Sequence, residues 1–195
     1  TTKECDRCVT ATTVLQNLPL FIDDTTALSI TALRTRARRL QRQYGCDLVV
    51  VDYLQLVAPD TKRNGFNRVN EISEVTMGLK AMAKERDVPV LALSQLARNV
   101  EGRDDKRPQL SDLRESGSIE QDADVVMFVY RDEYYLERDK KKNGGPDHLA
   151  AMGQGDVLVE KQRHGPIGTV KLRFEARLTR FSDLIEGDEH AEEAA

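Results

Sequence analysis

The sequence predicts an α/β domain built around a mainly parallel central sheet that is flanked by helices. Three segments, at 48–51, 90–93 and 125–129, are continuous apolar runs, which is the pattern of strands buried on both faces. Before the first run and between the first two, apolar residues recur at helical spacing. This alternation of strands and helices is typical of folds with a parallel sheet.

Composition excludes two classes of protein. Hydrophobic residues make up 39% of the 195 residues, which together with the glycines is the apolar share of an ordinary folded domain and too large for a disordered chain. The longest apolar run, Val125 to Tyr130, is far shorter than the roughly 18 residues that a membrane helix needs. We therefore expect one folded domain without a membrane span.

The acidic charge is concentrated at the C-terminus. The formal net charge is −4, but the last thirteen residues hold six acidic side chains and no Lys or Arg, so the rest of the chain carries +2. We predict a domain over residues 1–184 and an acidic, disordered tail over 185–195. The overall charge does not exclude a basic face that binds nucleic acid.

Cysteine usage favours a reducing compartment. Cys5 and Cys8 have the spacing of a metal-binding pair, but no second pair of Cys or His follows at similar spacing, so we expect reduced thiols and not a zinc site. The chain has no secretory leader and begins with Thr1. We therefore expect a piece of a longer cytoplasmic protein.

The first predicted elements are a strand and a helix. Residues 18–22 form a short apolar run that predicts a strand. From Ser29, a suitable N-cap, the helical pattern continues to Tyr44, and Gly45 ends it. This helix carries five arginines, which we interpret as a solvated face, with a subunit or DNA contact as the alternative; they are Arg34, Arg36, Arg38, Arg39 and Arg42.

The rest of the chain is predicted to hold one more helix, three polar loops and an antiparallel hairpin. The hairpin follows from two segments that alternate apolar and polar residues around a turn at His164. These elements are the helix at 69–82, the loops at 60–67, 99–113 and 137–155, and the hairpin strands at 157–161 and 169–174.

Polar side chains follow two of the predicted parallel strands at their carboxyl ends, where ligands gather in such sheets. Asp52 follows the first strand, in the form of a Walker B segment whose carboxylate helps to hold Mg²⁺ on a nucleotide, directly or through water. Gln95 follows the next strand and is a candidate sensor of a phosphate. The alternative for Asp52 is the cap of a turn or helix.

Four longer strings carry a family resemblance: DLVVVDYLQL at 47–56, ALSQL at 92–96, DDKRPQLSDLRESGSIEQDAD at 104–124 and KQRHGPIGTV at 161–170. Over residues 14–184 the chain resembles the C-terminal motor domain of DnaB-type bacterial replicative DNA helicases. The resemblance implies a RecA-like fold and a homo-hexameric ring around one DNA strand. It also implies ATP with Mg²⁺ bound between subunits, hydrolysis that drives 5′→3′ movement, and primase and a helicase loader as partners. The strings disfavour a recombinase or clock-type relative.

The resemblance assigns four residues to ATP turnover. Asp52 corresponds to the Walker B aspartate and Gln95 to the family's phosphate-sensing glutamine. Lys161 and Arg163 correspond to a basic pair that reaches into the ATP site of the neighbouring subunit. Two positions apart on a strand, they share one face, and two cations suit a γ-phosphate whose charge shifts in the transition state. On spacing alone, a pair of exposed strand cations is the alternative.

The resemblance also implies a DNA-binding loop at Arg114, Glu115 and Gly117. Arg114 offers a charge-assisted contact to a phosphate, Glu115 fixes Arg114 or presents its backbone, and Gly117 permits close approach or a positive φ. No aromatic residue lies in 109–124, so we expect salt-sensitive, largely sequence-independent binding without base stacking. Weaker DNA candidates, for which a solvated loop is the equal alternative, are Lys62, Arg63 and Arg68.

One motif of the family is absent from the sequence. No Gly-x-x-x-x-Gly-Lys-Ser/Thr occurs, although that P-loop supplies the amides and the lysine that cradle the phosphates. The family's general-base Glu is also expected upstream. We therefore expect a fragment that lacks the P-loop and the N-terminal strands of the fold and is inactive by itself. The alternative is a truncated RecA-like module that binds single-stranded DNA or helicase subunits without ATP turnover.

Overall fold

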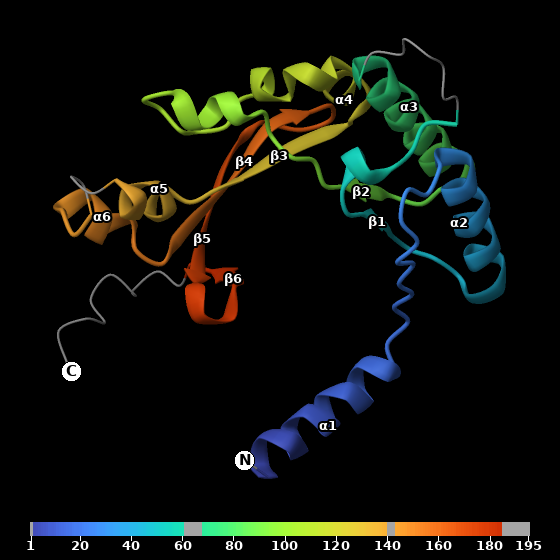
Figure 1. The fold of residues 1–195 in the computed structure, drawn as a ribbon, viewed down its shortest axis with the longest axis horizontal. Coiled ribbons are helices and arrows are strands. Elements are labelled where there is room, and N and C mark those ends of the chain that lie inside the picture. Colours follow the sequence, from blue (N-terminus) through green and yellow to red (C-terminus); the bar gives the residue numbers. More distant parts are fainter. Residues whose placement is uncertain (1, 61–67, 140–142, 185–195) are drawn as a thin grey trace.

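Two separate sheets organise the chain in the computed structural model, which describes residues 2–60, 68–139 and 143–184 (Figure 1). The predicted tail at 185–195 and the candidates Lys62 and Arg63 lie outside these residues. The helices are α1 (Thr2–Gln16), α2 (Ile30–Tyr44), α3 (Arg68–Arg86), α4 (Gly117–Asp122), α5 (Asp132–Arg138) and α6 (Pro146–Ala151). The strands are β1 (Val49–Val51), β2 (Val90–Ala92), β3 (Val125–Tyr130), β4 (Gln154–Gln162), β5 (Gly168–Glu175) and β6 (Arg180–Asp183).

The smaller sheet pairs β1 with β2 in parallel and is covered by α2 and α3 (Figure 1). The prediction of α2 is confirmed at both ends. The Ser29 hydroxyl accepts a hydrogen bond from the Ala32 amide at 3.3 Å, and Gly45 ends the helix at a φ of 82°. A positive φ at this point is a conformation that glycine adopts without strain.

Gly78 allows α2 and α3 to pack closely. A Cβ atom at this position would lie 2.3 Å from Cγ1 of Ile30, the first residue of α2. Ile30 is buried at the centre of the first core cluster together with Val75, Leu79 and Met82 of α3. A side chain at Gly78 would push the two helices apart. The glycine therefore allows Ile30 of α2 to pack directly against α3.

Only one face of the parallel sheet is covered by the described residues, so the predicted burial of β1 and β2 on both faces is wrong. Val51 is 7% exposed and faces the helices, whereas Val50 and Leu91 are 54% and 41% exposed on the other face. The continuous apolar run remains physically informative, because it leaves an apolar surface on the side that the helices do not reach.

The larger sheet is antiparallel, in the order β3-β4-β5-β6. The predicted hairpin is confirmed as β4 and β5. β3 was predicted as a third parallel strand, but it pairs antiparallel with β4, and its residues alternate between exposed and buried. Among the described strands, parallel pairing is therefore confined to β1 and β2, and the second core cluster lies under the buried face of β3, around Phe128 and Leu158.

Two local predictions are wrong. Residues 18–22 do not form a strand, because no described strand pairs with them; their side chains are exposed, and Phe21 stacks on Tyr44 with ring centroids 4.9 Å apart. The predicted loop at 137–155 contains α6, which begins with Pro146 at a position where a missing N–H costs nothing.

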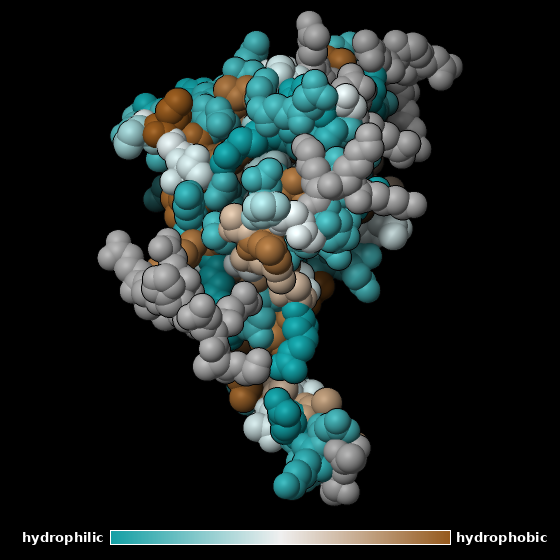
Figure 2. Space-filling model, turned by 90° about the vertical axis from the view of Figure 1, so that its left-hand side faces the viewer, coloured by the Kyte–Doolittle hydropathy of each residue, from teal (hydrophilic) through white to brown (hydrophobic). Residues whose placement is uncertain are grey.

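α1 projects away from the rest of the chain (Figure 1), and Figure 2 shows the same projection at the lower end of the molecule, with hydrophobic and hydrophilic residues mixed on its surface. Its side chains from Lys3 to Gln16 are exposed, including those of Val9 and Leu15.

Among the described residues, no helix combines the length and apolarity that crossing a membrane requires.

Replacing Gly78 by Ala should destabilise the domain, although Ala favours a helix over Gly by about 1 kcal/mol. The new methyl group would overlap buried Ile30, and overpacking of this kind costs about 1–3 kcal/mol. We expect the midpoint of urea unfolding to fall. Gly102→Ala is the control, because open space surrounds Gly102. An equal or higher midpoint for Gly78→Ala would contradict the packing argument.

Candidate functional site

The carboxyl ends of β1 and β2 bring Asp52 and Gln95 to one edge of the parallel sheet. The two strands are in register from Val49 with Val90 to Val51 with Ala92. Backbone hydrogen bonds continue the pairing beyond the strands, with the Leu93 N–H donating to Val51 O at 2.9 Å. Asp52 and Gln95 are both exposed. The edge thus offers a carboxylate and an amide to a ligand from solvent.

The donor set at this edge fits a Mg²⁺ ion that arrives with phosphates. No group of three or more His, Cys, Asp or Glu side chains in the described ranges could hold a metal by itself. Mg²⁺ commonly binds proteins through one or two carboxylates and keeps water and substrate phosphate oxygens as its other ligands. A single exposed carboxylate at Asp52 matches that mode and does not suit a metal held by protein alone.

Gln55 fixes the backbone next to Gln95. It lies in the short 3₁₀ turn Leu54–Leu56 that follows Asp52. Its Nε2 donates to Ser94 Oγ at 3.0 Å and to the Gln95 carbonyl at 3.3 Å, and its Oε1 accepts from the Gln95 N–H at 3.4 Å. The segment after β1 therefore holds the segment after β2, and the Gln95 side chain extends from a backbone that is anchored on both sides.

Lys161 and Arg163 lie together at the end of β4, on a different sheet from Asp52 and Gln95. Lys161 Nζ donates to the Glu120 carbonyl, and Arg163 Nη2 donates to the Gln121 carbonyl at 2.8 Å. Both acceptors are at the C-terminal end of α4, so the two basic side chains do share one side of the strand. Lys161 is half-buried and Arg163 is exposed, which keeps both at the surface.

Asp124 connects this basic pair to α3. Its carboxylate accepts a hydrogen bond from Lys80 and lies 3.4 Å from Arg163 Nε. The hydrogen bond from Lys80 is the main cause that lowers the pKa of Asp124 below its ordinary value, and the charges of Lys80 and Arg163 add to it against the opposing effect of burial. Asp124 is therefore ionised at neutral pH.

The predicted DNA-binding residues lie where the 3₁₀ segment Leu110–Ser116 meets α4. The side chains of Arg114 and Glu115 lie outside the described part of the chain. Gly117 is exposed, and nothing lies within 4 Å of the position that a Cβ would take. Its φ is −51°, so of the two alternatives expected for Gly117 the positive φ is not adopted, because the residue forms the first turn of α4. The open space does permit close approach.

An ion pair with a buried carboxylate holds the segment that leads to Gly117. Asp112 is 8% exposed and accepts from Arg103 Nη1 and Nη2, both at 3.0 Å, and from the Gln109 N–H at 2.8 Å. Arg103 also donates to the Arg107 carbonyl at 2.7 Å. Two guanidinium bonds to one carboxylate fix both distance and orientation. These bonds give segment 103–112 a defined conformation that supports the residues leading to Gly117, although its polar sequence predicts only a loop.

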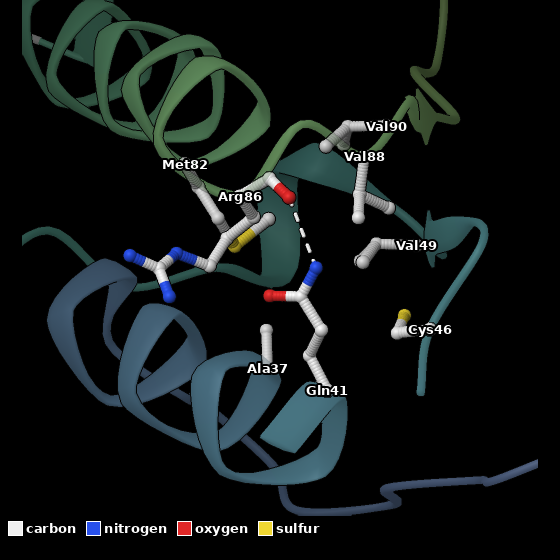
Figure 3. Close-up of a pocket in the computed structure, with 8 residues that line it drawn as sticks. All are labelled: Ala37, Gln41, Cys46, Val49, Met82, Arg86, Val88 and Val90. Atoms are coloured by element: carbon white, nitrogen blue, oxygen red, sulfur yellow. Dashed lines mark hydrogen bonds between the residues drawn. The ribbon is translucent and has the colours of Figure 1, made fainter. Parts of the chain in front are cut away.

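A small recess lies at the opposite end of the parallel strands, between α2 and α3 (Figure 3). It is lined by Val49 and Val90, the first residues of β1 and β2, and by Met82. The Gln41 Nε2 group donates to the Arg86 carbonyl across it at 2.9 Å. Because it opens at the amino ends of the strands, it is separate from the edge that carries Asp52 and Gln95.

The comparison with protein families decides the classification. The family model described as the DnaB-like helicase C terminal domain matches residues 1–183. The chain belongs to this family. The predicted resemblance and the predicted fold class, an α/β domain of RecA-like type, are confirmed.

Individual relatives agree with this assignment. The replicative DNA helicase DnaB of Rickettsia conorii is 52% identical over 177 residues, which cover 87% of this chain and 35% of the relative. The DnaB of Geobacillus stearothermophilus is 46% identical over 170 residues, again 87% of this chain and 35% of the relative. The chain thus spans about a third of the length of these relatives. A solved DnaB-like replicative helicase, described with its interactions with primase, superposes with a TM-score of 0.81 at 37% identity, covering 95% of this chain and 42% of its own.

Sequence reasoning did not identify three supporting residues of the candidate site. They are Gln55, Asp112 and Asp124. Each lies inside one of the family strings, in DYLQL, SDLRESG and IEQDAD respectively. Their position in these strings was the only available signal. The partners of Gln55 and Asp124 are far away along the chain, and no spacing rule pairs Asp112 with Arg103, nine residues before it. Gln55 bonds 40 residues ahead, and Lys80 and Asp124 are separated by 44 residues.

Replacing Asp112 by Ala should loosen the support of the predicted DNA-binding segment. The change leaves the Gln109 N–H and much of the Arg103 guanidinium without a partner, at a cost of about 1–3 kcal/mol. We expect amide hydrogen exchange in 103–117 to speed up by about tenfold or more. Asp104→Ala removes a neighbouring exposed carboxylate and is the control. Unchanged exchange in the Asp112 variant would show that the pair is not what orders the segment.

Proposed function

We propose that this chain is part of the motor domain of an ATP-dependent replicative DNA helicase, which unwinds duplex DNA as a hexameric ring that moves 5′→3′. The observation that carries the proposal is the placement of Asp52 and Gln95 at the same carboxyl edge of a parallel sheet, in a chain that belongs to the DnaB-like family. That edge is where α/β sheets bind their ligands.

ATP with Mg²⁺ is the proposed ligand of this edge. Asp52 would hold the metal directly or through water, and Gln95, anchored by Gln55, would contact the γ-phosphate. Bound Mg²⁺ would neutralise charge on the β- and γ-phosphates. The exposed carboxylate and the exposed amide support this assignment, because a ligand that brings its own phosphate oxygens completes the coordination.

Lys161 and Arg163 are proposed to act on the ATP of a neighbouring subunit. They lie at the surface of one sheet, whereas Asp52 and Gln95 lie at the edge of the other. A cation pair supplied from a neighbour makes hydrolysis depend on assembly, which is the behaviour expected of a homo-hexameric ring. The two cations would stabilise the charge that develops on the transferred phosphoryl group.

Single-stranded DNA is the proposed ligand of Arg114, Glu115 and Gly117. Open space around Gly117 supports close approach of a phosphate backbone, and the Arg103–Asp112 pair supports a fixed position for the segment. Further proposed partners are primase and a helicase loader, and the proposed place of action is the cytoplasm. The solved helicase described with primase supports the first of these partners by analogy.

The chain by itself is proposed to be inactive in ATP hydrolysis. No P-loop motif occurs in its 195 residues, and the apolar face that bears Val50 and Leu91 is exposed. The P-loop, the general-base Glu and the cover for this face would come from the rest of a longer protein. The missing P-loop also favours the alternative, a module that binds DNA or helicase subunits without turnover. An ATPase assay of the full-length protein separates the two functions.

Replacing Arg163 by Ala in the full-length protein should abolish ATP hydrolysis, with a fall in kcat of about 10³-fold. ATP binding should be largely retained, because the phosphates keep Asp52 and the rest of their own subunit's site. Steady-state ATPase and nucleotide-binding measurements check this. Arg177→Ala, which removes another exposed arginine, is the control. Normal turnover in the Arg163 variant would remove this residue from the proposed role.

Replacing Arg114 by Ala should weaken binding of single-stranded DNA and reduce the stimulation of ATPase by DNA. The loss of one phosphate contact should lower the slope of log K against log salt by about 0.7. Fluorescence titrations at several salt concentrations measure both effects, again with Arg177→Ala as the control. Unchanged affinity at moderate salt would argue against the proposed DNA contact.

A further inference from the structure

The carboxylate of Asp124 lies where α3, α4 and β4 meet. Lys80 of α3 donates a hydrogen bond to Oδ2, and Nε of Arg163 lies 3.4 Å from Oδ1. The backbone N–H of Arg163 also donates to the Asp124 carbonyl at 3.0 Å. One residue therefore contacts both the backbone and the side chain of Arg163.

The end of α4 holds the outer part of the same guanidinium. Arg163 Nη2 donates to the Gln121 carbonyl at 2.8 Å, and the last carbonyls of a helix have no partner within the helix. A guanidinium carries five N–H donors in one plane. Among the described residues, Asp124 and Gln121 contact Nε and Nη2 of Arg163, and Nη1 can donate to an oxygen of a bound phosphate.

We propose that Asp124 is the positioning residue for Arg163 in ATP hydrolysis, an inference that rests on the role proposed above for Arg163 in a neighbouring subunit's site. Asp124 fixes the guanidinium before the subunits meet. A flexible arginine that is already held loses less freedom when it reaches the phosphate, and its donors arrive in the orientation that the transition state needs. Lys80 holds the other oxygen of the Asp124 carboxylate.

A purely structural ion pair is the competing explanation, and it predicts a different result. The side chains of Asp124 and Arg163 are 54% and 46% exposed, and exposed ion pairs contribute little to folding stability. Replacing Asp124 by Asn keeps the backbone hydrogen bond to Arg163 and should leave the thermal unfolding midpoint nearly unchanged. Only the positioning role predicts a loss of turnover from this variant.

The test uses the full-length hexameric protein with single-stranded DNA and ATP. Asp124→Asn should lower kcat by about tenfold, while KM for ATP changes by less than about twofold, because Arg163 acts mainly in the transition state. Asp124→Glu keeps the charge and should recover part of the loss. Glu175→Gln is the matched control, because it breaks another exposed pair, that of Glu175 with Arg180 at 2.9 Å, and should leave kcat unchanged.

Arg163→Ala, measured in parallel, separates this proposal from the proposed function. If Arg163→Ala abolishes turnover and Asp124→Asn keeps a normal kcat, the positioning role is overturned and the role of Arg163 stands. If Arg163→Ala turns over normally, both are overturned. In single-turnover measurements the double variant should be no slower than Arg163→Ala alone, and a further loss would overturn the proposal. A lower unfolding midpoint together with no recovery by Asp124→Glu would assign Asp124 a structural role only.

Discussion

The two sheets are joined through α4, and the relative placement of the candidate sites depends on that joint. Within the described residues the sheets share no strand pairing. Ile119 of α4 instead packs against both core clusters. The Thr76 hydroxyl of α3 also donates to the Asp122 carboxylate at 2.6 Å. Apolar packing and a partly buried hydrogen bond thus connect α3, which covers β1 and β2, to the sheet that carries Lys161 at the end of β4.

The sequence predicted the elements whose causes are local. Ser29 and Gly45 bound α2 because a cap hydroxyl and a glycine act on their immediate neighbours. Pairing was predicted less well, because the apolar run of β3 signals burial but does not say which strand lies beside it. The same limit applies to 18–22, where an apolar run has no described strand to pair with.

The candidate site was predictable only in part. Asp52 and Gln95 follow adjacent strands, and simple topology places such residues at one edge. Gln55, Asp112 and Asp124 gain their importance from partners that folding brings to them, namely the backbone at Gln95, the Arg103 guanidinium, and Lys80 with Arg163. No spacing rule connects Gln55 with Gln95 or Asp124 with Lys80, which are 40 or more positions apart, or Asp112 with Arg103, nine positions before it, so such roles emerge only from the three-dimensional arrangement.

In the proposed helicase, the short helix α4 connects the DNA-binding segment at one end to the basic pair proposed for ATP hydrolysis at the other. Its six residues correspond to a length of about 9 Å. Gly117, at the end of the proposed DNA-binding segment, begins the helix, and the carbonyls of Glu120 and Gln121, which hold Lys161 and Arg163, lie near its end. If the proposed DNA contact displaced Gly117, a helix this short would carry those carbonyls with it. The hydrogen bond from Lys80 of α3 to Asp124 would oppose this movement next to Arg163. The orientation of Arg163 would therefore depend both on the position of the Gln121 carbonyl, which belongs to α4, and on the Asp124 carboxylate, which Lys80 holds in place.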